Sequence, residues 1–134
     1  MRPATLRQAA RRRAGDPGAN ALAEFLDEFY AADTDSARRA MLAEEPAKSA
    51  NRREDALLGA IAEYLSKQYR LGAPPRWAGD PWRSLPLPWH TTEAPTPAMI
   101  EYLTFASPAE FRHRNIFTDE LPLRRASQAA TGRM

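Results

Sequence analysis

The chain has 134 residues, of which 43% are hydrophobic and 27% charged, and its net charge is +2. This length and composition suit one globular domain with one core. The absence of Cys excludes disulfides, thiol catalysis and thiolate metal sites. No apolar run approaches the roughly 20 residues that span a bilayer, and no apolar core follows the basic N-terminal residues as in a secretory signal. We therefore expect a cytoplasmic protein without membrane association.

The amino-acid usage predicts an all-α fold. The chain contains no Val and only three Ile, against 26 Ala. Strands favour β-branched and aromatic residues, whereas helices favour Ala, Leu, Glu and Arg. We predict a small helical bundle with a long Pro/Trp-rich loop and a short capped C-terminal helix. Residues 20–126 would form this single domain, between a flexible basic arm (1–19) and a loose tail (127–134).

The N-terminal arm is basic and the next helices are acidic. Residues 1–13 contain five Arg and no acid, whereas residues 21–63 contain ten acids and five bases. A short helix near residues 5–13 would have little apolar surface to bury, so we predict a mobile arm. Basic ends on an acidic middle point to nucleic acid or an acidic partner, and solvated helix faces are the plainer alternative.

Three amphipathic helices are expected between residues 20 and 71. Asn20 can cap a helix to residue 32, and Asp33 or Thr34 a second one that Pro46 ends. The longest pattern runs from residue 51 to residue 71 and stops at Gly72. Short connections predict antiparallel packing of these helices.

The segment 73–97 holds seven of the twelve Pro and all three Trp, so it cannot be a long helix. It is too aromatic for a disordered linker. Either its Trp rings pack over the bundle, or they line a groove for a peptide or ligand, with Trp82 and Trp89 as contact residues. A further helix should run from Thr96 to Ala106, with Met99, Ile100, Leu103 and Phe105 as its apolar residues.

The segment 107–117 reads Ser-Pro-Ala-Glu-Phe-Arg-His-Arg-Asn-Ile-Phe. Ser107 and Glu110 match a capping box, and Asn115 suits the left-handed residue that ends a helix. We predict a two-turn helix that presents Arg112, His113 and Arg114. Arg112 and Arg114, together with Arg124 and Arg125, would bind a phosphate or carboxylate partner, or would pair internally with the acidic helices.

No residue pattern points to catalysis, to a cofactor or to a metal. His90 and His113 lack the second ligand that a zinc site requires. Arg83 and His90 have the Arg-x(4–6)-His spacing of helical ribonucleases, but Pro86 and Pro88 break any helix between them. There is no Gly-rich phosphate loop. A ribonuclease is the third interpretation, behind two non-enzymatic ones.

Five segments resemble an uncharacterised bacterial family of small helical proteins and C-terminal regions of helix-turn-helix regulators. They are residues 21–26, 42–46, 55–65, 88–90 and 107–117. The resemblance covers roughly residues 20–126, and the last segment is its most specific part. It implies a gene neighbour of the nucleotidyltransferase-like type, as in a toxin–antitoxin pair, and it supplies no catalytic residues. Residues 1–19 are too short for a DNA-binding domain, which favours partner binding.

We therefore predict a non-enzymatic protein-interaction module, antitoxin-like or the accessory subunit of a bacterial two-gene system. Its partner would be another protein encoded nearby, and a homo-oligomer remains open. The alternative is a nucleic-acid-binding regulator that uses the basic arm and the C-terminal basic residues. The predicted partner-binding residues are Arg112, Arg114, Trp82, Trp89, Arg124 and Arg125.

Overall fold

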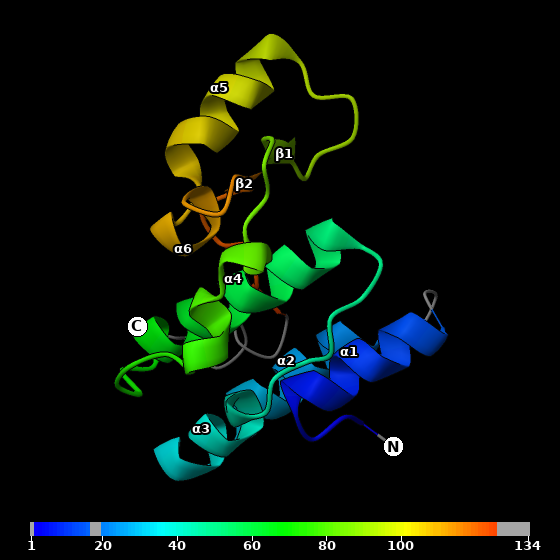
Figure 1. The fold of residues 1–134 in the computed structure, drawn as a ribbon. Helices are drawn as coiled ribbons and strands as arrows, with labels where there is room; N and C mark the ends of the chain where they lie inside the picture. Colours follow the sequence, from blue (N-terminus) through cyan, green and yellow to red (C-terminus); the bar gives the residue numbers. More distant parts are fainter. Residues whose placement is uncertain (1, 17–19, 126–134) are drawn as a thin grey trace.

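A computed structural model describes residues 2–16 and 20–125, and it confirms the predicted all-α class (Figure 1). The helices are α1 (Leu6–Gly15), α2 (Ala21–Ala31), α3 (Asp35–Ala43), α4 (Arg52–Gln68), α5 (Pro97–Ala106) and α6 (Ala109–Arg112). Two 3-10 turns, η1 (Arg76–Gly79) and η2 (Pro81–Arg83), lie in the Pro/Trp-rich loop. Strands β1 (Trp89–His90) and β2 (Ile116–Phe117) pair in parallel, with Trp89 opposite Ile116. The predicted tail over residues 127–134 lies outside the described residues.

Helices α3 and α4 start where their capping residues predict. The Thr34 hydroxyl accepts a hydrogen bond from the Ala37 N–H at 3.0 Å, and the Asn51 side chain accepts one from the Glu54 N–H at 3.1 Å. Each cap satisfies a backbone donor that the first turn leaves without a helical partner. The chain leaves α4 through Gly72, whose φ of +95° is readily adopted only by glycine.

Helix α4 is the central element of the fold. Figure 1 shows α1, α2 and α3 on one side of α4, with α6 and the strands on the other. Leu58, Ile61 and Leu65 of α4 are buried in a core that also contains Phe25 and Phe29 of α2. The loop adds Trp77 to this core, and α6 adds Phe111. Segments distant in the sequence are thus assembled around one helix.

The described part of the predicted arm is folded, which differs from our expectation. Residues 6–15 form α1, and it packs against α2. The prediction underestimated how much apolar surface this helix buries, because Leu6 and Ala9, one turn apart, are both completely buried. The Thr5 hydroxyl also caps the helix by accepting from the Gln8 N–H at 3.1 Å.

The α5 helix lies at one end of the molecule, beyond the strands and α6 (Figure 1). Leu103 is its one residue classed as buried, and Leu103 does not belong to the main core around α4. α5 is therefore an outlying helix that is not part of the main core.

None of the helices in residues 2–16 and 20–125 combines the length and apolar character needed to cross a membrane.

Candidate interaction surface

The sequence around α5 defines a rigid helix. Its N-terminus is capped by the Thr96 hydroxyl, which accepts from the Met99 N–H at 3.2 Å, and Pro97 occupies the first helical position. At the other end the Ser107 hydroxyl accepts from the Thr118 N–H at 2.7 Å, and its single proton is shared between the carbonyls of Leu103 at 2.5 Å and Thr118 at 2.9 Å. These bonds join the end of α5 to the chain that follows β2.

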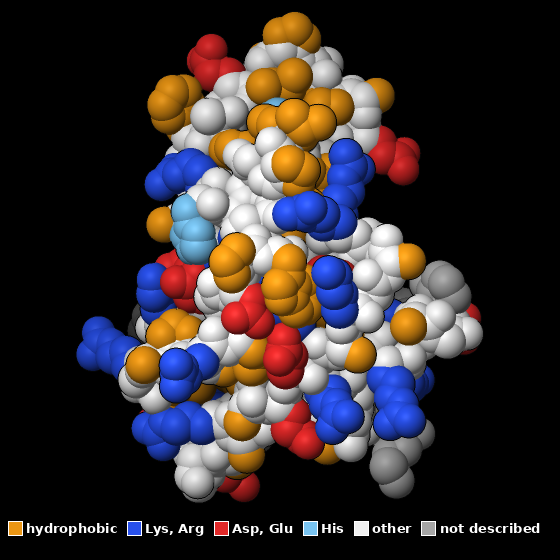
Figure 2. Space-filling view, in the orientation of Figure 1, with side chains coloured by type: hydrophobic (Ala, Val, Ile, Leu, Met, Phe, Trp, Pro, Cys, Tyr) orange, Lys and Arg blue, Asp and Glu red, His pale blue; other side chains and the backbone are white. Residues whose placement is uncertain are grey.

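The outward side of α5 is apolar. Ala98, Tyr102 and Phe105 are exposed and spaced i, i+4 and i+7, so they share one side of the helix, which we call the α5 face. Tyr102 is 52% exposed and Phe105 79%, although both rings are large. Figure 2 shows hydrophobic side chains gathered at this end of the molecule. An exposed apolar patch of this kind marks a contact surface.

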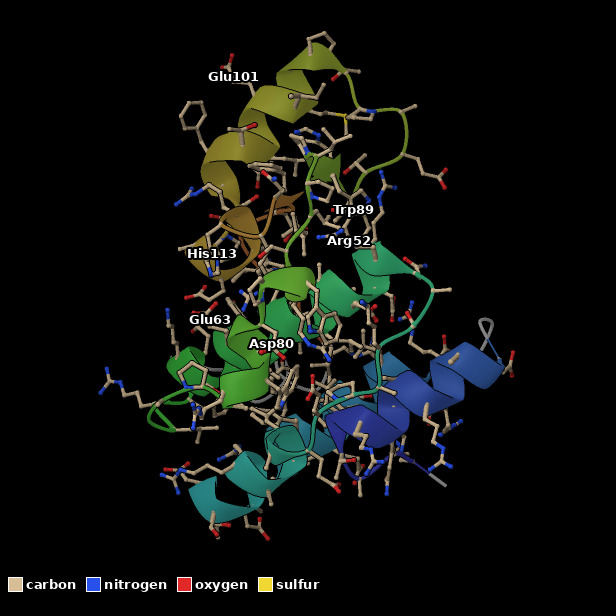
Figure 3. All side chains as sticks on the ribbon, viewed as in Figure 1. Arg52, Glu63, Asp80, Trp89, Glu101 and His113 are labelled. Carbon is tan, nitrogen blue, oxygen red and sulfur yellow. The ribbon has the colours of Figure 1, made fainter. Side chains whose placement is uncertain are left out.

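The segment that contains α5 is acidic in sequence, although Glu110 lies 3.6 Å from Lys67 and the exposed Arg112 follows it. Residues 91–111 contain Glu93, Glu101 and Glu110 and no Lys or Arg. Glu101 is the only ionised side chain of α5, and it points away from the rest of the molecule in Figure 3. The α5 face is therefore an apolar strip with negative charge beside it.

The helix predicted in residues 107–117 is present, but it is shorter than the expected two turns and lacks the expected Ser107 cap. Helix α6 has four residues, and its N-cap is Pro108, without a side-chain hydrogen bond. The Ser107 hydroxyl is engaged by Thr118 and by the carbonyl of Leu103, so it cannot cap α6. Asn115 does take the predicted left-handed conformation, with a φ of 66°.

Arg114 faces inward, as the internal-pairing alternative expected. Its side chain is 3% exposed, and its guanidinium donates to Glu63 Oε1 at 2.6 Å, to the Glu110 carbonyl at 2.7 Å and to the Ala78 carbonyl at 2.6 Å. His113 Nε2 lies 2.8 Å from the same Glu63 oxygen, and Figure 3 shows these two side chains together. Arg114 thus clamps the C-terminal segment onto α4 and is not available to a partner.

Glu63 is held as a carboxylate by these neighbours. Burial alone would raise its pKa. Hydrogen bonds from Arg114 and His113, the charge of Arg114 and a hydrogen bond from Lys67 outweigh burial and lower the pKa to about 2. The cluster therefore acts as an ion-paired link between α4 and α6.

A second buried arginine, Arg83, holds the Pro/Trp-rich loop. It is completely buried and donates to the carbonyls of Asp55 at 3.0 Å and Pro46 at 2.7 Å. Its Cζ lies 4.6 Å from the ring centroid of Trp77 and 4.1 Å from that of Trp82. Because its guanidinium is taken up by these carbonyls and rings, Arg83 serves to pack the loop against the bundle. The buried position of Arg83 gives no support to a ribonuclease pair with His90.

The Trp residues divide between core and surface. Trp77 is buried and its indole N–H donates to the Leu42 carbonyl at 3.2 Å, which agrees with the interpretation that the loop packs over the bundle. Trp82 and Trp89 are half-buried, and each ring also has a cation beside it: Lys48 Nζ at 5.4 Å from Trp82 and Arg53 Cζ at 5.3 Å from Trp89. These two rings remain partly accessible.

The remaining predicted arginines differ in their partners. Arg112 and Arg124 are exposed, and no carboxylate in the described residues lies within ion-pair distance of either one. Arg125 makes a two-point ion pair with Asp27, at 3.0 and 3.2 Å. Of the six predicted residues, Trp89, Arg124 and Arg125 line one pocket, whereas Trp82, Arg112 and Arg114 do not line it.

The basic N-terminal segment is paired with the acidic helices. Ion pairs join Arg2 to Glu28, Arg7 to Glu44, Arg12 to Glu24 and Arg13 to Glu54. The two sequence regions of opposite charge therefore meet within the molecule. Most of the positive charge expected to attract an external anion is used internally.

The α5 face was missed because Met99, Ile100, Leu103 and Phe105 were predicted only as the apolar residues of this helix, and no exposed side was identified. Apolar side chains occupy nearly the whole circumference of α5, namely Met99, Ile100, Tyr102, Leu103 and Phe105. A helix that is apolar on all sides is either buried or in contact with another molecule. A ten-residue segment at the end of a long loop has few neighbours that could bury it. A helix that is apolar on all sides and has few neighbours to bury it was the sequence signal for an exposed contact surface.

Within the described residues, no group of three or more His, Asp or Glu is placed to hold a metal ion. Comparison of the chain with protein-family models, with curated proteins and with solved structures gives no match. Function is therefore argued from the geometry.

Proposed function

We propose that this chain is a non-enzymatic protein-interaction module, the antitoxin-like or accessory subunit of a bacterial two-gene system, and that α5 binds the partner protein. The observation that carries this proposal is the outward exposure of Tyr102 and Phe105 on a capped helix outside the main core. Exposing two aromatic rings forgoes the free energy of burying them, which a partner surface can recover.

The spacing of the α5 face suggests how the partner binds. Residues at i, i+4 and i+7 are the anchors by which a helix lies in a hydrophobic groove of another protein. The exposed carboxylate of Glu101 on α5 favours a groove with Lys or Arg at its border, because complementary charge fixes orientation and repels wrong partners. We propose a protein partner with an apolar groove and a basic border. The resemblance to proteins encoded beside a nucleotidyltransferase-like neighbour is consistent with such a partner.

The test begins with co-purification of the tagged chain from its native host, with and without nuclease treatment. The captured candidate is then purified, and its affinity is measured for the wild type, for Phe105→Asp and for the control Leu87→Asp. Leu87 is 74% exposed and lies outside α5, so the control introduces the same charge at a similarly exposed position. Circular dichroism checks that both variants fold.

We expect Phe105→Asp to weaken binding by about thirtyfold, the loss typical of a hot-spot aromatic residue, and Leu87→Asp to change it less than about threefold. Hydrogen exchange should locate protection on an apolar, basic-bordered groove of the partner. Equal affinities of the two variants would overturn the role of α5. Capture of a second copy alone, or of partners lost on nuclease treatment, would overturn the two-protein proposal.

A further inference from the structure

A pocket of about 470 Å³ lies where α2, α4, α6, the strands and residues 118–125 meet. Its lining is largely apolar and includes Leu22, Leu26, Leu57, Ile61, Phe111 and Ile116. Small-molecule sites usually have volumes of about 300–1,000 Å³ and mostly apolar walls with a few polar groups. The size and the walls therefore fit a small organic ligand. No residue of α5 lines this pocket, so it is separate from the α5 face.

The charged groups of the pocket all have one sign. Arg13, Arg124 and Arg125 line it, and none of its lining residues is Asp or Glu. Arg13 is paired with Glu54 and Arg125 with Asp27, at 2.9 and 3.0 Å. Arg124 is the lining arginine without a carboxylate partner in the described part of the chain. One positive charge is thus free to meet a ligand.

We infer that this pocket binds a small amphipathic monoanion, namely a carboxylate carried by an alkyl chain or an aromatic ring. The apolar part would lie against the leucine, isoleucine and phenylalanine side chains, where removal from water is favourable. The carboxylate would pair with Arg124, whose guanidinium matches its two oxygens. A polyphosphate fits less well, because two of the three arginines already have their charge neutralised.

The probe is decanoate, below its micelle-forming concentration, with the uncharged 1-decanol as the matched ligand. Binding to the full-length chain is measured by calorimetry, and amide chemical-shift changes locate the site. We expect decanoate to bind with shifts confined to the lining residues, and 1-decanol to bind about tenfold more weakly, because it lacks the charge that Arg124 would meet.

Two variants separate the contributions of charge and space. Arg124→Gln should weaken decanoate about tenfold and leave 1-decanol unchanged, whereas the exposed Arg76→Gln, outside the pocket, should change neither. Ala23→Phe adds a ring to the half-buried lining and should weaken both ligands. Absence of decanoate binding, or undiminished binding by Ala23→Phe, would overturn the site. The anion assignment would be overturned if decanoate and 1-decanol bound with equal affinity and Arg124→Gln changed neither affinity.

Discussion

At the residue scale, Glu63 is the residue on which the side chains of Arg114, Lys67 and His113 converge. Arg114 and His113 both reach its Oε1 atom, and Lys67 lies 3.2 Å from Oε2. Glu63 is on α4, whereas Arg114 and His113 follow α6, about fifty residues later. The carboxylate therefore couples two segments whose attachment depends on its ionisation.

This coupling predicts a pH dependence of stability. The folded pKa of Glu63, about 2, lies below its ordinary value of 4.5, so ionised Glu63 stabilises the fold above pH 4.5. The contribution is lost as the pH falls from 4.5 toward 2. Between pH 6 and pH 3 the wild type should lose about 1 kcal/mol more free energy of unfolding than Glu63→Gln, which is about half of what the shift in pKa alone would give, because solvent screens the pair. Urea unfolding at both pH values measures it.

Glu54 must be separated from this effect. Burial raises its pKa, an effect that Arg13 opposes and Asp55 reinforces, so its ionisation destabilises the fold as the pH rises above 4.5. Glu54 is present in both proteins and cancels in their difference. Glu120→Gln, at an exposed position without an ion pair in the described residues, is the matched control and should follow the wild type. Parallel curves for the wild type and Glu63→Gln would contradict the prediction.

At the element scale, Gly59 explains how α4 accommodates two buried arginines. A Cβ at this position would lie 3.2 Å from Arg114 Nε and 3.2 Å from both Cβ and Cδ of Arg83. These distances are shorter than ordinary van der Waals contacts. Both arginines are tied to backbone carbonyls, so neither can move aside without losing hydrogen bonds. The missing side chain leaves room for both of them.

We expect Gly59→Ala to destabilise the protein by about 1–2 kcal/mol, the cost typical of overpacking. Helix propensity alone predicts the opposite sign, because Ala in a helix interior is favoured over Gly by about 1 kcal/mol. The control is Gly15→Ala at the end of α1, where nothing lies within 4 Å of the added Cβ. It should be neutral or slightly stabilising. Chemical unfolding checks both, and stabilisation by Gly59→Ala would contradict the close packing.

The helices were predictable because their signals are local. Thr34, Asn51 and Thr96 each cap the helix that the pattern of apolar residues predicted, and Gly72 and Pro46 follow the expected stops. The β1–β2 pair was not predictable in this way. Each strand has two residues, and the partners are separated by 27 positions. Strands of two residues are too short to show the alternation of apolar and polar side chains by which a strand is predicted.

The burial of Arg83 and Arg114 could not be read from the sequence. An arginine is usually exposed, and its burial depends on carbonyls that only the fold brings near, such as those of Pro46 and Ala78. Gly59 within a strongly helical pattern was the one local hint. The α5 face was missed for the complementary reason, because an apolar residue is assumed to be buried until the fold shows what covers it.

At the scale of the whole molecule, the pairing of opposite charges bears on the nucleic-acid alternative. A basic arm free in solution would contact several phosphates, and the logarithm of affinity would fall steeply with the logarithm of salt concentration. Here Arg2, Arg7 and Arg12 already face Glu28, Glu44 and Glu24. A contact of any of these three arginines with DNA would first have to break an internal pair. Weak binding with a shallow salt dependence is expected.

The measurement is binding of a labelled DNA duplex across a range of salt concentrations. The wild type should show a slope below about 2 in magnitude, equivalent to about two phosphate contacts. Replacing Glu28 and Glu44 by Gln removes the carboxylate partners of Arg2 and Arg7 and should steepen the slope by about 1–2. The control replaces Glu93 and Glu120 by Gln, which raises the net charge equally but breaks no ion pair within the described residues. If the control had as steep a slope as the first variant, net charge and not the ion pairs would determine the salt dependence. A slope of five or more in magnitude for the wild type would restore the regulator interpretation.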